Sequence, residues 1–347
     1  MGWRIGDTDP ADKYPLQGQK FILDMAVCDM QLRMRRHPVR HWVAHHVGWL
    51  VHIDIELVGR RSIFARSNEV TDTGPPIRLT QGTVAICPTR HAPQEMTKTP
   101  PNSGLVTGAA LQASGDNIGS AIARELAVDF ALLVADLRDP AETAAALGKP
   151  AVAFAADVTR PADCRAMVAA AEALGPLRVV VHAAGITRPA LPVERIAAEE
   201  WELVLQTNLT SAFHLCQAAI PALRRAGGGS IVLISSRAGR SPFVSRGVTP
   251  VSTKAHYAAS KAGIISLTRS LALELAADGI RVNCVAPGPV KGEMLPEHLL
   301  SAAAASVPLG RVADPREIAR VVFFLCSEAA SFVTGQTLDV NGGQVMH

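Results

Sequence analysis

The sequence contains no concentrated metal-binding or disulfide-forming motif. Its six cysteines lie far apart and include no CxxC pair, and no cluster of histidines completes a zinc site. Spacing of this kind predicts neither a bound metal ion nor a disulfide framework. We therefore expect reduced, mostly buried thiols and a cytoplasmic location.

Long apolar runs and a large surplus of one charge are missing as well. The best candidate for a membrane span, residues 42–57, is interrupted by histidines, an aspartate and a glutamate, and the N-terminus has no secretory signal pattern. The 34 basic and 31 acidic residues give a net charge of +3, too little to neutralise a nucleic-acid backbone. We expect neither a membrane nor a nucleic acid as a partner.

Apolar residues are plentiful enough for a large core. Hydrophobic residues make up 48% of the chain and charged residues 19%, which is the composition of a globular protein. Residues 1–95 hold six of the 11 histidines and show no clear helical or alternating pattern. Three interpretations of this segment stay open: a partly ordered extension, a small accessory domain, or upstream sequence attached by a misplaced start codon.

Residues 96–347 show a regular alternation of short apolar strands and helical stretches. The pattern predicts strands near 104–107, 130–135, 150–156, 178–182, 230–234 and 280–285, with helices near 121–126, 161–174 and 257–277. Such alternation requires a parallel sheet covered on both faces. The expected fold class is α/β: a doubly wound parallel sheet of the Rossmann type, forming a single main domain with an N-terminal extension.

A glycine-rich turn follows the first of these strands. Glycines in such a turn let the backbone approach a pyrophosphate, which the free amides of the next helix stabilise. Asp136 ends the second strand 17 residues after the last glycine, close to the spacing of about 20 for a carboxylate that binds ribose hydroxyls. That carboxylate repels the extra phosphate of NADP, so NAD(H) is favoured over NADP(H). The candidate cofactor residues in the turn are Gly108, Gly115, Ile118 and Gly119.

A tyrosine, a lysine and a serine form the candidate catalytic group. Tyr257 and Lys261 open a long helix four residues apart and so share one face. A nearby positive charge favours the phenolate, so we expect Lys261 to lower the pKa of Tyr257 from about 10 and make it a general acid/base. Ser236 follows an apolar strand at its carboxyl end, where open α/β sheets bind ligands.

The order of these motifs resembles the short-chain dehydrogenases/reductases over residues 104–347. Asp157-Val158, Ala183-Ala-Gly185, Asn208 and Pro287-Gly288 complete the resemblance. It implies an NAD(P)(H)-dependent oxidoreductase that interconverts a secondary alcohol and a ketone by hydride transfer, without a metal. The implied catalytic residues are Asn208 (which positions a relay water), Ser236, Tyr257 and Lys261; the implied cofactor residues include Asp157, Val158, Ala184, Gly185, Tyr257, Lys261, Pro287 and Val290.

Two segments look more specifically like the 3-oxoacyl-(acyl-carrier-protein) reductase branch: residues 185–189 and the tail from Pro308. This likeness implies a small-molecule or acyl-thioester substrate and a homotetramer. One alternative is therefore such a reductase using NADPH, which Asp136 opposes. Another is a non-catalytic dinucleotide-binding regulatory protein, which the retained catalytic side chains oppose.

The sequence departs from the family pattern in four places. The glycine turn carries extra residues, His182 replaces an asparagine in a structural role, and Gly292 stands where a threonine is common. Ser236 and Tyr257 lie 21 residues apart, a longer interval than usual. We expect the excess, around residues 241–254, to form an enlarged wall of the substrate cleft.

Overall fold

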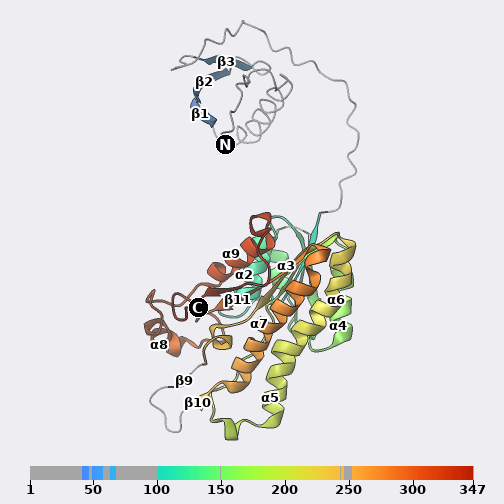
Figure 1. Cartoon of the computed structure of the whole chain (residues 1–347), viewed down its shortest axis with the longest axis vertical. Coiled ribbons are helices and arrows are strands. Elements are labelled where there is room, and N and C mark those ends of the chain that lie inside the picture. The colour runs from blue at the N-terminus through green and yellow to red at the C-terminus, as the bar shows by residue number, and fades with distance from the viewer. Residues whose placement is uncertain are drawn as a thin grey trace, which may run out of the picture. The chain divides into compact units, whose positions relative to one another are not determined.

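The computed structural model describes residues 41–46, 49–57, 63–67, 101–148, 150–242, 244–245 and 252–346. The chain divides into two units, residues 1–92 and 93–347, which are described separately (Figure 1). The boundary expected at residue 96 falls outside the described residues and stays a prediction, as do the three interpretations of the N-terminal segment.

The first unit contains an antiparallel sheet of three strands in the order β1-β2-β3. These are β1 (His41–His46), β2 (Trp49–Leu57) and β3 (Ile63–Ser67). The sequence analysis found no alternating pattern in this part of the chain and did not predict these three strands. The segment that came nearest to a membrane span forms the paired strands β1 and β2.

The second unit is built on a parallel sheet of seven strands in the order β12-β11-β8-β7-β4-β5-β6. The chain starts at β4, runs outward through β5 and β6, and then crosses back to β7. The carboxyl ends of β4 and β7 therefore border the crevice where such sheets bind ligands. The strands are β4 (Ser103–Thr107), β5 (Ala131–Asp136), β6 (Ala151–Ala155), β7 (Leu177–His182), β8 (Gly229–Ile234), β11 (Ile280–Pro287) and β12 (Thr337–Val340).

Helices cover both faces of this sheet, as the doubly wound prediction requires (Figure 1). Successive residues of a strand point to opposite faces. Leu105 accordingly packs with one core, formed against α4, α6 and α7, whereas Val106 packs with the other, formed against α2 and α9. The helices are α2 (Ile118–Leu126), α3 (Ala141–Ala146), α4 (Pro161–Glu172), α5 (Ala198–Leu205), α6 (Ser211–Arg225), α7 (Ala255–Leu275), α8 (Leu300–Ala305) and α9 (Pro315–Cys326).

All six strands expected from the apolar runs are present, and β12 is an additional one at the sheet edge. Cys164, Cys216, Cys284 and Cys326 are buried, free thiols, whereas the other two cysteines lie outside the described residues. Among the helices that the structure describes, none is long and apolar enough to cross a membrane. Within the same residues, no group of histidine, cysteine or acidic side chains is arranged to hold a metal ion.

Candidate active site

Ser236 lies just beyond the buried strand β8. Its backbone is extended, and its hydroxyl accepts a hydrogen bond of 3.1 Å from the amide of Ala238, the middle residue of the single-turn helix η4 (Arg237–Gly239). The preceding Ser235 donates from its hydroxyl to the carbonyl of Lys261 at 2.7 Å. The strand end that carries Ser236 is therefore tied directly to helix α7.

Lys261 is almost completely buried beneath the tyrosine expected to act with it. Only 4% of its surface is exposed, and its ammonium donates to the carbonyl of Ile234 at 2.9 Å. The Nζ atom lies 5.8 Å from the centre of the Tyr257 ring. Burial lowers the pKa of Lys261 to about 8, because the low-dielectric surroundings disfavour the charged form.

The pKa of Tyr257 moves in the direction opposite to our prediction. Burial of the phenol raises its pKa, and this effect exceeds the opposing influences. A hydrogen bond from Ser236 and the positive charge of Arg237 both act to lower it. The electrostatic support of the phenolate in this structure therefore comes from Ser236 and Arg237, not from Lys261 as the sequence suggested.

Asn208 is fully buried within a π-helical turn, η3 (Gln206–Thr210), between α5 and α6. Its side-chain oxygen accepts from the amide of Ile186 at 2.7 Å, and its Nδ2 donates at 3.0 Å both to the carbonyl of Ile186 and to the hydroxyl of Ser260. The single amide thus joins the loop after β7 to helix α7. Turns of this kind often occur at functional sites.

His182 fills a structural position at the end of β7. One ring nitrogen lies 3.0 Å from the hydroxyl of Thr107 and the other 3.0 Å from the hydroxyl of Ser211, so the ring links β4 to α6. Burial lowers the pKa of His182 to about 3, and the nearby charge of Lys261 adds to this effect. A neutral imidazole that bonds to two hydroxyls fits the structural role expected for it.

Two glycines of the turn after β4 allow a close approach of backbone segments. Gly108 has a positive φ of 70°, and a Cβ atom there would lie 2.6 Å from the amide nitrogen of Ala184. A Cβ on Gly119 would lie 2.7 Å from the carbonyl carbon of Gly108. A larger residue at Gly108 would push the end of β4 away from the segment after β7, and one at Gly119 would push the start of α2 away from the end of β4.

The extra residues of the turn form a small hairpin. Gln112 and Gly115 exchange two backbone hydrogen bonds of 3.1 and 2.9 Å, and Gly115 has a φ of 102° with open space around it. Gly115, predicted as a cofactor residue, therefore sits at a turn of the hairpin and not at a close approach. Asn117 follows it as the N-cap of α2 and exchanges hydrogen bonds with Ser120.

The start of α2 and the end of β5 supply groups suited to a dinucleotide. No described residue accepts a hydrogen bond from the backbone amides of Ile118 and Gly119, so both can bind an anion at the helix N-terminus. Asp136 ends β5, and its carboxylate accepts from the amide of Ala110 at 3.0 Å and from that of Arg138 at 3.1 Å. It therefore lies against the glycine turn.

The remaining predicted cofactor residues line the same edge of the sheet. A Cβ on Gly185 would lie 3.3 Å from the Lys261 ammonium and 3.1 Å from the Asn208 side-chain oxygen. Asp157 follows β6 and caps its own turn through Thr159. Located at the carboxyl ends of β6, β7 and β11, or in the loops that follow them, are Asp157, Val158, Ala184, Gly185, Pro287 and Val290.

These residues fit a nicotinamide dinucleotide. The close backbone approach at Gly108 and Gly119 and the free amides of α2 suit a pyrophosphate, while Asp136 suits the adenosine ribose. Gly185 leaves space next to the Lys261 ammonium at the other end. The amides of α2 and the Asp136 carboxylate would therefore face the adenosine half of the cofactor, and the space beside Gly185 would face the nicotinamide half.

Comparison with known proteins agrees with this geometry. The family model described as enoyl-(acyl carrier protein) reductase matches residues 108–345. A 3-oxoacyl-(acyl-carrier-protein) reductase of Vibrio cholerae is 38% identical over 249 residues, covering 70% of this chain and 96% of the relative. A (3R)-3-hydroxyacyl-CoA dehydrogenase of Mus musculus is 38% identical over 261 residues, covering 70% of this chain and 95% of the relative.

Solved structures agree as well. The crystal structure of a short-chain dehydrogenase/reductase from Burkholderia xenovorans matches with a TM-score of 0.64 and 33% identity, covering 70% of this chain and 96% of that chain. The chain therefore belongs to the short-chain dehydrogenase/reductase family. It is an oxidoreductase acting on a CH–OH group, and it is similar to the 3-oxoacyl reductase branch of that family.

Ser236, Tyr257, Lys261 and Asn208 are together called the catalytic corner. Sequence reasoning did not single out two further side chains that the structure places near them. Arg237 follows Ser236 and acts electrostatically on Tyr257. Lys254 precedes helix α7, and its ammonium donates to the hydroxyl of Thr187 at 3.1 Å. Both lie at the ends of the long Ser236–Tyr257 interval, whose greater length was the one signal that pointed to them.

Proposed function

We propose that this oxidoreductase uses Tyr257 as the proton donor and acceptor and NAD(H) as the hydride carrier. The proposal rests chiefly on one arrangement: the Nζ atom of the buried Lys261 lies 5.8 Å from the centre of the Tyr257 ring, and Ser236 lies near enough to the phenol to lower its pKa. A substrate oxygen placed between the serine and tyrosine hydroxyls would meet two donors at once.

In ketone reduction, Ser236 would donate a hydrogen bond to the substrate oxygen and stabilise the negative charge that develops there. Tyr257 would give its proton to that oxygen, and in alcohol oxidation it would take the proton back. Lys261 would hold a positive charge below the phenol, and Asn208 would keep the Ile186 loop against α7. The nicotinamide, when bound, supplies or accepts the hydride at the substrate carbon.

The preference for NAD(H) rests on Asp136. Its carboxylate faces the glycine turn, where it would accept from the ribose hydroxyls and repel a phosphate. Arg138, two residues on, is directed to Glu293 at 3.4 Å. Titration with NADH and NADPH, followed by fluorescence, tests this choice: tighter NADPH binding, retained in Asp136→Ser, would rule out the carboxylate as the discriminating group.

The substrate has two candidate classes. A small secondary alcohol or ketone is the leading one, and a 3-oxoacyl thioester reduced with NADPH is the alternative that the name of the Vibrio cholerae relative favours. A turnover screen of alcohols, ketones and 3-oxoacyl thioesters with the cofactor that binds separates them. Cofactor binding without turnover of any substrate would favour the regulatory alternative.

A homotetramer is the assembly that the exposed apolar surface supports. Trp201 and Leu203 of α5 are 38% and 44% exposed and line a hollow of about 500 Å³, and Leu273 of α7 is 85% exposed. Exposed apolar groups on neighbouring helices favour contact with a second copy. Light scattering tests this assembly, because Leu273→Glu should reduce the measured mass.

The free, buried thiols agree with a cytoplasmic location.

The decisive experiment for the mechanism is Tyr257→Phe, which removes one hydroxyl and leaves the ring in place. We expect turnover to fall by about 10³-fold or more while the Kd of the cofactor changes little. A variant that kept its turnover would exclude Tyr257 as the acid/base. Calorimetric binding of the cofactor provides the control for correct folding.

A further inference from the structure

The segment that follows β11 carries an acidic residue, Glu293, across the sheet to the end of β5. Three strands, β8, β7 and β4, lie between β11 and β5 in the sheet order. The usual strand spacing therefore separates the ends of β11 and β5 by about 19 Å. The carboxylate of Glu293 nevertheless lies 3.4 Å from the guanidinium of Arg138, two residues after β5. The segment thus runs along the carboxyl edge of the sheet, where the residues suited to a dinucleotide lie.

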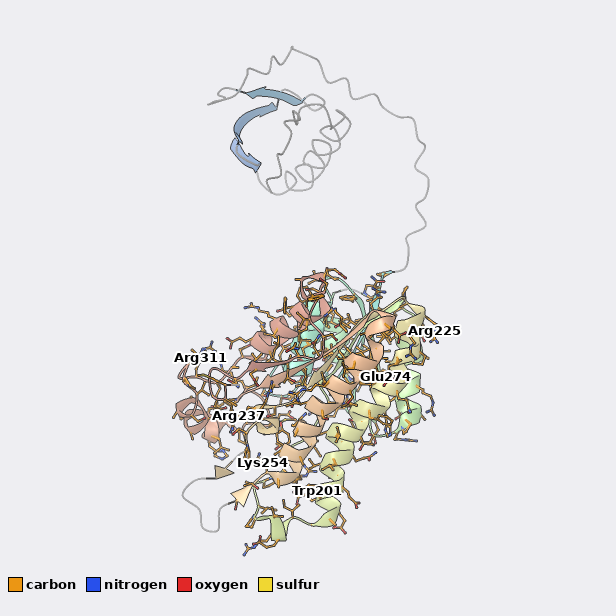
Figure 2. The ribbon with its side chains drawn as sticks, in the orientation of Figure 1. Trp201, Arg225, Arg237, Lys254, Glu274 and Arg311 are labelled. Carbon is orange, nitrogen blue, oxygen red and sulfur yellow. The ribbon has the colours of Figure 1, made fainter. Side chains whose placement is uncertain are left out.

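Backbone contacts anchor this segment just before Glu293. The amide of Lys291 donates to the carbonyl of Ala313 at 3.0 Å, which ties the segment to the chain that leads into helix α9. Arg311, which Figure 2 labels, lies two residues before Ala313 and pairs with Glu317 of α9 at 2.7 Å. The approach of Glu293 to the end of β5 therefore starts from a fixed point of the fold.

Two of the departures from the family pattern, the extended glycine turn and Gly292, meet at Glu293. The backbone amide of Glu293 donates to the side-chain oxygen of Gln112, in the inserted hairpin, at 3.2 Å. Gly292 has a φ of 141°, which L side chains rarely adopt, and a Cβ there would lie 3.4 Å from the same oxygen. A β-branched threonine at this position would be strained and would crowd Gln112. The extended turn and Gly292 thus together hold the backbone of Glu293.

Arg138 adjoins the carboxylate that suits the adenosine ribose. Its amide donates to Asp136 at 3.1 Å. In sheets of this kind an arginine near that carboxylate accommodates the 2′-phosphate of NADP. In this structure the guanidinium instead contacts both carboxylate oxygens of Glu293 at 3.4 Å. The ion pair alone is weak, because its side chains are 54% and 44% exposed, but a phosphate at this place would also be repelled by the charge of Glu293.

We propose that Glu293 is a second determinant of cofactor choice, which occupies Arg138 and adds a negative charge beside the 2′-hydroxyl, and so opposes the binding of NADP(H). Gln112 is the positioning residue that holds the backbone of Glu293. NAD(H) has no phosphate at this place, so the pair stays intact when NAD(H) binds. The inference rests on the proposed dinucleotide site and adds a residue to the choice that Asp136 makes there.

Nucleotides that lack the nicotinamide isolate this effect in the full-length chain. Adenosine 2′,5′-bisphosphate and adenosine 5′-monophosphate differ only in the phosphate concerned, and each displaces the bound reduced cofactor in a fluorescence titration. We expect Glu293→Gln to tighten the binding of the bisphosphate and of NADPH about 3- to 10-fold. The Kd values of the monophosphate and of NADH should change less than about twofold. Arg138→Gln, added to Glu293→Gln, should remove most of the gain.

Glu297→Gln is the matched control, because this exposed acidic residue lies four positions further along the same segment and its replacement changes the net charge equally. It should leave all four Kd values nearly unchanged. Gln112→Met tests the positioning role: it should tighten NADPH binding about two- to threefold in the wild type and have no effect once Glu293 is replaced. Damage to the turn itself would weaken the binding of all four ligands in either background. Circular dichroism checks that each variant is folded.

Three outcomes would overturn the inference. Glu293→Gln could leave the discrimination between bisphosphate and monophosphate unchanged, Glu297→Gln could alter it equally, or the gain could persist without Arg138. Tighter binding of NADPH than of NADH by the wild type would contradict the proposed use of NAD(H). The inference would still hold in that case if Glu293→Gln tightened NADPH binding further. Absence of binding of either cofactor would contradict both proposals.

Discussion

We propose that the glycine turn binds the cofactor and that the catalytic corner binds the substrate beside it. Different kinds of contact hold the two regions in place. Within the turn, the inserted hairpin closes on itself through Gln112 and Gly115, whereas Asp136 and Thr143 hold the residues just before it. The corner is held by contacts between distant segments, such as the bond from Lys261 to Ile234 and that from Asn208 to Ser260, 52 residues away.

This difference explains where the chain tolerates change. A hairpin whose backbone groups pair with each other can be inserted into the turn, provided that the close approach of Gly108 and Gly119 is kept. A corner built from distant segments has no such freedom, because each buried polar group depends on a partner from another element. The extended turn and the unchanged Ser236, Tyr257 and Lys261 follow this rule.

The largest effect should come from removing the buried cation of the corner. Lys261→Met takes away the positive charge under the Tyr257 ring and the donor to the Ile234 carbonyl. We expect kcat to fall by about 10³-fold. Circular dichroism should show a folded protein, and Arg269→Gln on the same helix should keep full activity. A loss below tenfold would mean that the corner does not need this charge.

The next largest effect should follow from Asn208→Ala. The substitution removes three buried hydrogen bonds and leaves Ile186 and Ser260 without their partner. We expect the free energy of unfolding to fall by about 2–4 kcal/mol, measured by urea denaturation. Gln206→Ala, an exposed position on the same π-helical turn, should change it by less than about 0.5 kcal/mol. Equal effects would contradict the view that the buried hydrogen bonds of Asn208 stabilise the fold more than the exposed one of Gln206.

A smaller effect is expected from two glycine substitutions within the turn. Gly119→Ala places a methyl group against the Gly108 carbonyl and should weaken cofactor binding about tenfold by shifting the start of α2. Gly115→Ala puts its methyl group into open space, so only local strain from the positive φ is expected, with a Kd changed less than about threefold. Calorimetric titration measures both. The reverse order would show that the hairpin contacts the cofactor.

The smallest effect concerns the dependence of stability on pH. The pKa of His182 is about 3 in the folded protein and about 6.5 when unfolded, so the unfolded chain binds more protons between these values. His182 therefore contributes stability above pH 6.5 that is lost as the pH falls toward 3, by at most about 1.4 kcal/mol per pH unit. His182→Gln should flatten this slope, which urea denaturation measured at several pH values would show.

The sequence predicted the centre of the fold better than its edges. The runs that form β4, β5 and β8 are buried on both faces and therefore apolar throughout, which makes them easy to identify. Strand β12 is half-buried at the sheet edge, and its residues give a weaker pattern. The three N-terminal strands showed no alternation that we could detect, and helix α5 exposes Trp201 and Leu203, which weakens its amphipathic pattern.

The sequence predicted which residues form the candidate site, but it did not predict the direction of the Tyr257 pKa shift. Motif spacing placed Ser236, Tyr257 and Lys261 together, because the family pattern fixes their order. The direction of the Tyr257 pKa shift depends on burial and on Arg237, and neither is visible in a four-residue spacing. The contact between Lys254 and Thr187 joins segments 67 residues apart, which local patterns do not report.

The described parts of the segment between Ser236 and Tyr257 include two short strands that pair with each other. The short strand β9 (Val244–Ser245) pairs with β10 (Ser252–Thr253), and Thr253 of β10 also pairs with Leu191 in the segment after β7. A segment anchored in this way can in principle change in length without moving its two ends. Replacing this segment by a shorter or longer one between the same strands would change the substrate specificity, while the hydroxyls of Ser236 and Tyr257 keep their positions.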